Sequence, residues 1–197
     1  MGRWEPNARG RLEQAALQLY VERGFEQTTV AEIAKRAGLT ERTFFRHFAD
    51  KREVLFWGAR ALQELLVSNV DAAPASLPPI EAIAAALCAA AEGIFEERRD
   101  FARQRQAIID ANAELQEREL IKLASLASAL AEALRRRGVG DPASSLAAES
   151  GIAVFKIAFA DWIRGPEERT LSESIRASVD ELTHVVRTEN VGRRARR

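Results

Sequence analysis

Apolar residues recur along most of the chain at the three- and four-residue spacing of an amphipathic α-helix. Glycine, proline and capping residues divide this pattern, and no strand-like alternation is sustained over several segments. In residues 7–23, for example, Leu12, Ala16 and Leu19 share one face, and Gly24 then suits a helix C-cap. The pattern therefore predicts an all-α protein of about nine helices.

Two short helices are expected after the first, each opened by a threonine cap. Thr29 and Glu32 have the spacing of a capping box, and the second helix stops at Gly38. Thr40 then caps a short third helix. Two helices joined by so short a turn predict a helix-turn-helix, whose second helix enters the major groove of DNA.

The rest of the chain predicts a larger helical body. A long fourth helix is expected from Asp50 to about Asn69, a proline-rich break at residues 71–79, and a fifth helix from Ile80 to about Arg98. Four more helices begin at the capping residues Asp100, Asn112, Asp141 and Thr170. We expect a three-helix DNA-binding head over residues 1–50, an effector-binding and dimerisation body over 51–189, and a basic, disordered tail over 190–197.

The third helix has one apolar side and an opposite side that carries both charged residues and a phenylalanine. At 100° per residue, Phe44 and Phe48 lie together and must face the core of the head. Phe45 points away from it, which makes sense against thymine methyl groups or sugar carbons, and Arg42 can donate two hydrogen bonds to guanine. The predicted base-contacting residues are Glu41, Arg42 and Phe45.

Other polar residues around this helix suit the DNA backbone. Glu41 either accepts from cytosine N4 or holds Arg42 in place, and Arg46 reaches phosphate instead of bases. The alternative is that the two arginines form an ordinary solvated face. The predicted backbone-contacting residues are Thr29, Thr43, Arg46, His47 and Lys51.

Charge and composition restrict how the protein can bind DNA and in which cellular compartment it is expected. Lys plus Arg and Asp plus Glu both number 29, so DNA binding must depend on local charge and not on overall attraction. No apolar run reaches the roughly 20 residues of a membrane span. The single cysteine, Cys88, excludes an internal disulfide, and a cytoplasmic protein is expected.

The sequence predicts no enzyme, no metal and no cofactor. Only two histidines and one cysteine are present, too few for a metal centre or a cysteine–histidine nucleophile to be expected. Gly138 and Gly140 follow a helix and not a strand, unlike a dinucleotide-binding loop.

Two apolar sets in the body suggest further sites. The narrow stripe of Ile175, Val179, Leu182 and Val186 predicts a dimer interface, formed with the apolar eighth helix in an intermolecular four-helix bundle. The second set predicts a ligand pocket, although aromatic residues at helical spacing also build ordinary cores. Its members are Ile94, Phe95, Ile109, Phe155, Phe159 and Trp162.

Residues 24–55, GFEQTTVAEIAKRAGLTERTFFRHFADKREVL, resemble the DNA-binding signature of the TetR family of transcriptional regulators. The resemblance implies a homodimer, usually a repressor, that a small ligand releases from a palindromic operator. By position, it implies that bases are contacted by Glu41, Arg42 and Phe45. It also implies that the DNA backbone is contacted by Thr29, Thr43, His47 and Lys51. The family commonly has tyrosine at position 45, and Phe45 lacks the hydroxyl that could bind phosphate.

The sequence also allows two other functions. One is a constitutive DNA-binding dimer without a ligand, in which the body serves only to dimerise. The other is a helical small-molecule carrier with a vestigial helix-turn-helix, which the intact groove-facing residues argue against.

Overall fold

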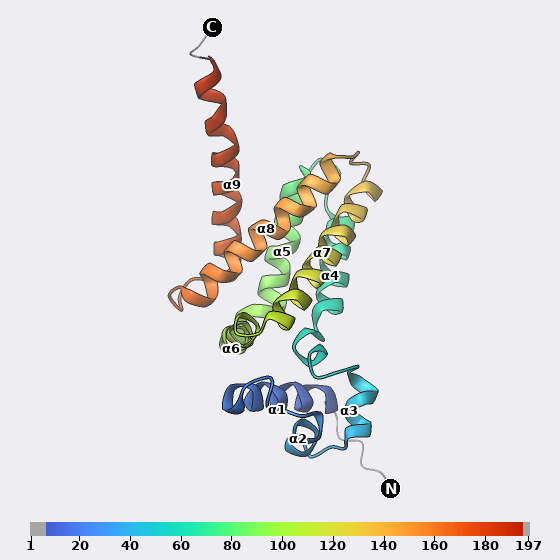
Figure 1. Ribbon diagram of the computed structural model, residues 1–197. Helices are drawn as coiled ribbons and strands as arrows, with labels where there is room; N and C mark the ends of the chain where they lie inside the picture. The colour runs from blue at the N-terminus through green and yellow to red at the C-terminus, as the bar shows by residue number, and fades with distance from the viewer. Residues whose placement is uncertain (1–6, 195–197) are drawn as a thin grey trace. The chain divides into compact units, whose positions relative to one another are not determined.

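The computed structural model describes the backbone of residues 7–194 and the side chains of residues 7–187. Within that range every regular element is helical, which confirms the predicted all-α class (Figure 1). The α-helices are α1 (Ala8–Arg23), α2 (Val30–Arg36), α3 (Glu41–His47), α4 (Ala59–Ala72), α5 (Pro79–Ala90), α6 (Arg99–Asp110), α7 (Ala113–Arg136), α8 (Ala143–Arg164) and α9 (Leu171–Arg194). Three shorter elements are the 3₁₀ helices η1 (Glu53–Phe56) and η3 (Glu96–Arg98) and the π-helix η2 (Ala91–Phe95).

The chain forms two compact units whose boundary differs from the expected one at residue 50. The first unit contains residues up to Arg60 together with Phe101–Ile121, and the second contains Ala61–Asp100 and the chain from Lys122 onward. The reason is hydrophobic: Ile108, Ile109 and Leu115 belong to the same buried cluster as the aromatic residues of the head. Ile109, predicted for a ligand pocket, is completely buried in this cluster instead.

The core of the first unit comes from one face of each short helix. From α1 it takes Leu12, Ala16, Leu19 and Tyr20, all at most 3% exposed. Phe44 and Phe48 pack on each other with ring centroids 5.5 Å apart, and both are buried, as their spacing predicts. Since each large buried side chain contributes roughly 1.5–3 kcal/mol, these residues hold the three helices together.

The predicted long fourth helix is wrong. Asp50 accepts hydrogen bonds from the amides of Arg52 and Glu53, but the element that follows is the short 3₁₀ helix η1, whose N-cap is Arg52. The chain then turns at Trp57 and Gly58 before α4 begins. Glycine disfavours a helix interior because its unfolded backbone has more freedom to lose, and Gly58 stands where the helix is interrupted.

The predicted fifth helix is also interrupted. α5 ends at Ala90, and η2 and η3 carry the chain to α6. Gly93 lies inside η2, again at a position where glycine weakens regular helix. The sequence pattern could not show this, because apolar spacing continues through the irregular turns.

In the second unit, α8 is the most apolar long helix. Trp162, Ile152 and Val154 on it are at most 5% exposed. It is the one helix within residues 7–194 that has the length and composition to cross a membrane, a test that core helices of soluble proteins also pass.

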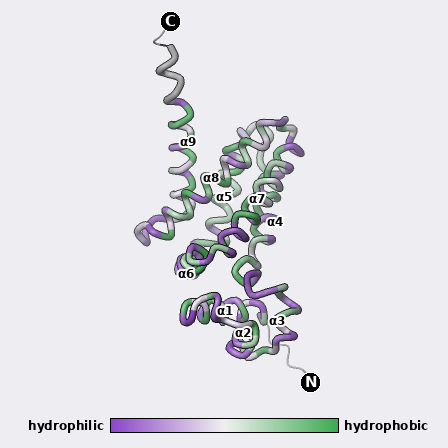
Figure 2. Tube along the Cα trace, in the orientation of Figure 1, coloured by the Kyte–Doolittle hydropathy of each residue, from purple (hydrophilic) through white to green (hydrophobic). Residues whose placement is uncertain are grey.

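The two halves of α9 differ. Leu171, Ser172 and Ile175 in its first half are buried, so Ile175, predicted for a dimer interface, packs inside its own subunit. Between residues 176 and 187 no side chain is buried, and Figure 1 shows this half extending away from α5 and α8. Hydrophilic and hydrophobic residues are interspersed along it (Figure 2).

The end of α9 also differs from the expected tail. The helix continues to Arg194, so residues 190–194, predicted to be disordered, are helical. The remainder of that predicted tail, residues 195–197, lies outside the described part of the chain.

Candidate nucleic-acid interface

The turn between α2 and α3 requires glycine. Gly38 has a φ of +66°, a left-handed conformation that side chains with a Cβ rarely adopt. A Cβ at this position would also lie 2.7 Å from a guanidinium nitrogen of Arg11, which donates to the carbonyl of Ala37. α3 therefore starts in a direction set by Gly38 and Arg11.

Local capping then forms α3. The hydroxyl oxygen of Thr40 accepts a hydrogen bond from the amide of Thr43 at 3.2 Å. Glu41 lies in the first turn and Arg46 in the last, so each of these two charges matches the helix dipole. Seven residues suffice for a stable helix here because its inner face is buried.

The neighbouring residues Phe44 and Phe45 lie on opposite faces of α3. Phe44 is fully buried, whereas Phe45 is 55% exposed. Glu41, Arg42 and Arg46 are exposed on the same side as Phe45. The outward set therefore has the exposure that groove contact needs, while contact with bases stays a prediction.

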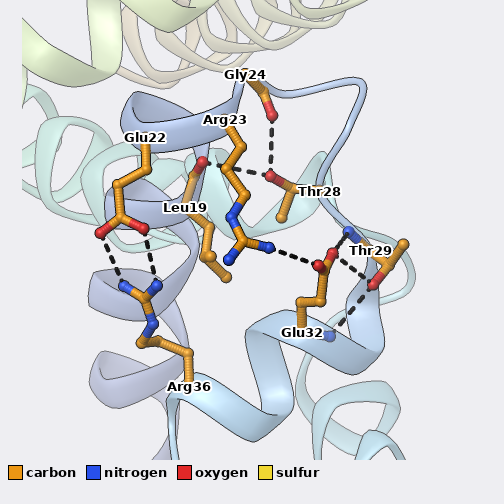
Figure 3. Close-up of polar contacts among 8 residues, drawn as sticks. All are labelled: Leu19, Glu22, Arg23, Gly24, Thr28, Thr29, Glu32 and Arg36. Carbon is orange, nitrogen blue, oxygen red and sulfur yellow. Dashed lines mark hydrogen bonds and ion pairs between the residues drawn. The ribbon is translucent and has the colours of Figure 1, made fainter.

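The hydroxyl of Thr29 is already engaged at the start of α2 (Figure 3). It donates to Glu32 at 2.9 Å and accepts from the amide of Glu32 at 3.3 Å, while the Thr29 amide donates to the same carboxylate. Arg23 adds a fourth bond at 2.8 Å. The hydrogen bonds from Thr29, with smaller help from Arg23, lower the pKa of Glu32. To donate a hydrogen bond to phosphate, the Thr29 hydroxyl would have to give up its hydrogen bond to Glu32.

Two further predicted phosphate ligands are half-buried. The hydroxyl of Thr43 lies 3.0 Å from that of Thr40. Nε2 of His47 is buried without a hydrogen-bond partner in the described residues. Burial, followed by the charges of Arg46 and Arg9, lowers the pKa of His47, so the ring is neutral near pH 7.

Lys51 is the predicted phosphate ligand whose placement differs most from expectation. Its ammonium donates to the carbonyls of Phe25, Glu26 and Thr28. The hydroxyl of Tyr20 in turn donates to the Lys51 carbonyl at 2.7 Å. Nothing in the sequence spacing indicates these contacts, which join segments more than 20 residues apart.

The predicted pocket residues of the second unit form an aromatic cluster. Phe95, Phe155, Phe159 and Trp162 follow one another with ring centroids 5.7–5.9 Å apart, and Ile94 beside them is half-buried. The guanidinium of Arg99 lies 5.4 Å from the Trp162 ring centre and donates to carbonyls at the end of α8. Phe95 ends the π-helix η2, and such irregular turns are frequent at functional sites.

A separate surface groove lies between α5 and α9. It encloses about 400 Å³ and is lined by Ala84, Ala85, Cys88, Ala89, Glu92 and Arg176. None of these residues was predicted for a pocket. In the described part of the chain, no group of three or more His, Cys, Asp or Glu residues is placed to hold a metal ion.

Comparison with known families decides what this helical arrangement belongs to. Residues 13–56 match the family model of bacterial regulatory proteins of the tetR family, and residues 77–187 match that of the MftR C-terminal domain. The chain belongs to the TetR family of transcriptional regulators. Its helix-turn-helix, α2 and α3, is therefore the DNA-binding element of a TetR-family regulator.

Two curated TetR-family relatives are similar over different lengths. The mycofactocin biosynthesis transcriptional regulator MftR of Mycobacterium tuberculosis is 28% identical over 188 residues, covering 91% of each chain. The regulator TcmR of Streptomyces glaucescens is 38% identical over 78 residues, which are 40% of this chain and 34% of TcmR. The TcmR match therefore extends over about a third of that protein.

Solved structures share the fold. A transcriptional regulator of Pseudomonas aeruginosa superposes with a TM-score of 0.64 at 19% identity, covering 91% of this chain and 92% of its own. SmeT in complex with triclosan gives 0.61 at 21% identity, covering 88% of each chain. Thermus thermophilus FadR in complex with lauroyl-CoA gives 0.53 at 23% identity, covering 89% and 93%.

Proposed function

We propose that the protein is a dimeric repressor that binds a palindromic operator through α3 of each subunit. A small, largely hydrophobic ligand bound to the second unit then releases it. The observation that carries the DNA-binding part is Phe45, 55% exposed between exposed arginines on a helix whose opposite face is buried. A large exposed ring is unfavourable in water and favourable against thymine methyl groups.

The outward residues have distinct proposed roles. Arg42 donates two hydrogen bonds to guanine O6 and N7, and Phe45 packs on thymine methyl or sugar carbons. Glu41 accepts from cytosine N4 or holds Arg42 in place. Arg46 and Thr43 contact phosphate, where they set the register of the helix without reading sequence.

Exposed apolar residues on α8 and α9 support the dimer. Leu146 and Ile157 on α8 are 63% and 64% exposed, and Val185 and Val186 on α9 are 58% and 65% exposed. Together with the half-buried Val179 and Leu182, they can form a four-helix bundle about a two-fold axis. The same axis would relate two α3 helices, which must lie about 34 Å apart to enter successive major grooves.

A ligand site in the second unit is proposed at the aromatic cluster of Phe95, Phe155, Phe159 and Trp162. The irregular η2 and η3 next to it lack regular helix bonding, so they can change shape at lower cost than an α-helix. Two proteins of the same fold were solved with largely apolar ligands, FadR with lauroyl-CoA and SmeT with triclosan. Acyl and aromatic compounds are therefore the first to screen as ligands.

The first experiment is selection of bound duplexes from fragmented genomic DNA, followed by mobility shifts with the purified protein. We expect one palindromic sequence bound at nanomolar concentration, with two half-sites whose centres are about 10 base pairs, or a multiple, apart. A cytoplasmic protein is expected, since its partner is DNA. Equal binding to operator and scrambled DNA would contradict the proposal.

The constitutive DNA-binding dimer is the main alternative. Reciprocity distinguishes the two: a ligand that weakens operator binding 100-fold must bind 100-fold more weakly to the operator complex, a coupling of roughly 2.7 kcal/mol. Calorimetry with acyl and aromatic compounds, with and without operator, measures both affinities. Equal ligand affinities would favour the constitutive dimer, and ligand binding without any DNA binding would favour the carrier.

A further inference from the structure

The ammonium group of Lys51 has all its donors in use inside the first unit. An ammonium carries three N–H groups, and Nζ lies 2.8 Å from the carbonyl oxygen of Phe25, 3.2 Å from that of Glu26 and 3.1 Å from that of Thr28. It also lies 4.3 Å from the centre of the Phe25 ring, within the range of a cation–π contact. No N–H group is left to donate to phosphate in this arrangement.

Two of the three residues whose carbonyls accept from Lys51 are buried, and contacts tie them to α1 and the turn that follows it. Phe25 and Thr28 are 2% and 1% exposed. The Phe25 ring meets that of Tyr20 edge-on, with centroids 5.1 Å apart, and the Tyr20 hydroxyl donates to the Lys51 carbonyl. The Thr28 hydroxyl donates to the Gly24 carbonyl at 2.9 Å. The segment after α3 is therefore fixed to the turn between α1 and α2.

We propose that Lys51 is a positioning residue for operator binding, and that it does not contact DNA. It holds the turn of residues 24–29, which leads into α2, against the segment that follows α3. The position of α2 relative to α3 then depends on the three hydrogen bonds of Lys51. This inference rests on the proposed function, because it explains how the helix-turn-helix keeps its DNA-binding shape.

A phosphate contact by Lys51 would conflict with this geometry. The ammonium would have to leave three carbonyl oxygens, two of which belong to buried residues, and those oxygens would lose charge-assisted hydrogen bonds. Arg46 is exposed on α3 and can reach phosphate without any such loss. The two residues therefore offer a matched comparison of a positioning cation with a contacting one.

Amine labelling of the unmodified protein tests the placement directly. Acetic anhydride is added to the protein alone and to its complex with the selected operator, and peptide masses give the extent of acetylation at each lysine. Lys35 and Lys156 are exposed and serve as references. We expect Lys51 to react at least tenfold more slowly than both, with no further change when operator is added. A Lys51 that reacts as fast as Lys156 and becomes protected by operator would overturn the proposal.

Salt dependence tests the role. Lys51→Met keeps an apolar stem on Phe25 and removes the donors, Lys51→Arg keeps donors and charge, and Arg46→Ala removes an exposed cation. Operator affinity is measured by fluorescence anisotropy at several salt concentrations, well below each melting temperature. A phosphate contact contributes about 0.9 to the slope of log affinity against log salt.

For Lys51→Met we expect at least a tenfold loss of operator affinity with an unchanged salt slope, and for Lys51→Arg a partial rescue. Arg46→Ala should lower the slope by about one. A slope lowered by about one in Lys51→Met would make Lys51 a phosphate ligand, and unchanged affinity would leave it a residue of stability only. Either result overturns the inference.

The controls keep the inference separate from the proposed function. If the wild-type protein binds no operator, the proposed function fails, while slow labelling of Lys51 in the free protein still reports its placement. If Lys51→Met does not fold, Lys51→Arg and the labelling experiment decide. A Lys51→Arg variant that binds as the wild type does, together with fast labelling of Lys51, would count against the positioning role.

Discussion

The guanidinium of Arg36 on α2 donates two hydrogen bonds to the carboxylate of Glu22 on α1, at 2.9 and 2.8 Å (Figure 3). Such a two-bond pair fixes orientation as well as distance. Arg23 and Glu32 form a second ion pair between the same helices. Exposed ion pairs stabilise proteins little, so these pairs chiefly set the angle at which α2 leaves α1.

The two carboxylates should make the stability of the first unit depend on acid pH. The bond from Arg36 lowers the pKa of Glu22, and bonds from Thr29 lower that of Glu32. Because the folded pKa values lie below the unfolded value of about 4.3, their contribution is present above that pH. It is lost as pH falls through the folded values.

Replacement of both residues, Glu22→Gln with Glu32→Gln, should therefore flatten the dependence of melting temperature on pH between about 5 and 3. Thermal unfolding followed by circular dichroism measures it. Glu26→Gln, in the exposed turn between the two helices, is the control. A double variant with the same pH dependence as Glu26→Gln would show that these pairs do not contribute.

Gly38→Ala should destabilise the first unit by more than about 1 kcal/mol, since alanine is strained at positive φ. The new methyl group would also displace Arg11 from its place beside the turn. Gly58→Ala is a matched control, because its Cβ would meet nothing within 4 Å and its φ is not positive. Urea unfolding of both variants measures the difference, and equal midpoints would contradict it.

Arg42→Ala should cost roughly 1–3 kcal/mol at the operator and relax preference at one base pair in each half-site. The reason is that the two hydrogen bonds proposed from Arg42 to guanine could not form with other bases. Binding to a panel of single-base operator variants measures the preference. If operator and scrambled DNA lose affinity by the same factor, Arg42 contacts phosphate and does not read bases.

Ile157→Glu and Val186→Glu should each weaken the proposed dimer at least tenfold. Burial of one large apolar side chain contributes roughly 1.5–3 kcal/mol, and a charge in its place would lie in an apolar interface. Sedimentation velocity at micromolar concentrations measures the association. Val21→Glu alters a similarly exposed valine on α1, 59% exposed, and should leave the dimer intact. A wild-type protein that is monomeric throughout would refute the interface.

The faces of the helices were predictable because burial follows the periodicity of the backbone. Phe44, Phe45 and Phe48 are chemically alike, and their spacing alone separates the exposed ring from the buried ones. The capping box of Thr29 and Glu32 was equally visible, since all its contacts lie within three residues.

Contacts between distant segments were not predictable in the same way. The apolar face of α6 indicates that Ile109 is buried, but not which of the two cores it joins. A lysine is normally exposed, so no sequence pattern indicates that Lys51 bonds to carbonyls of a turn 23–26 residues earlier. The break at Gly58 competes with a capping signal at Asp50, and the pattern alone does not say which prevails.

The acceptors around Lys51 are peptide carbonyls, which every amino-acid sequence supplies at those positions. Substitutions at the exposed Glu26 therefore leave the anchor of the turn in place. If positions 41, 42 and 45 contact bases as proposed, a lineage that acquires a new operator would have to replace those side chains, but it would inherit the lysine unchanged. Sequence divergence among descendants should consequently concentrate on the outer face of α3 and leave Lys51 and its contacts unchanged.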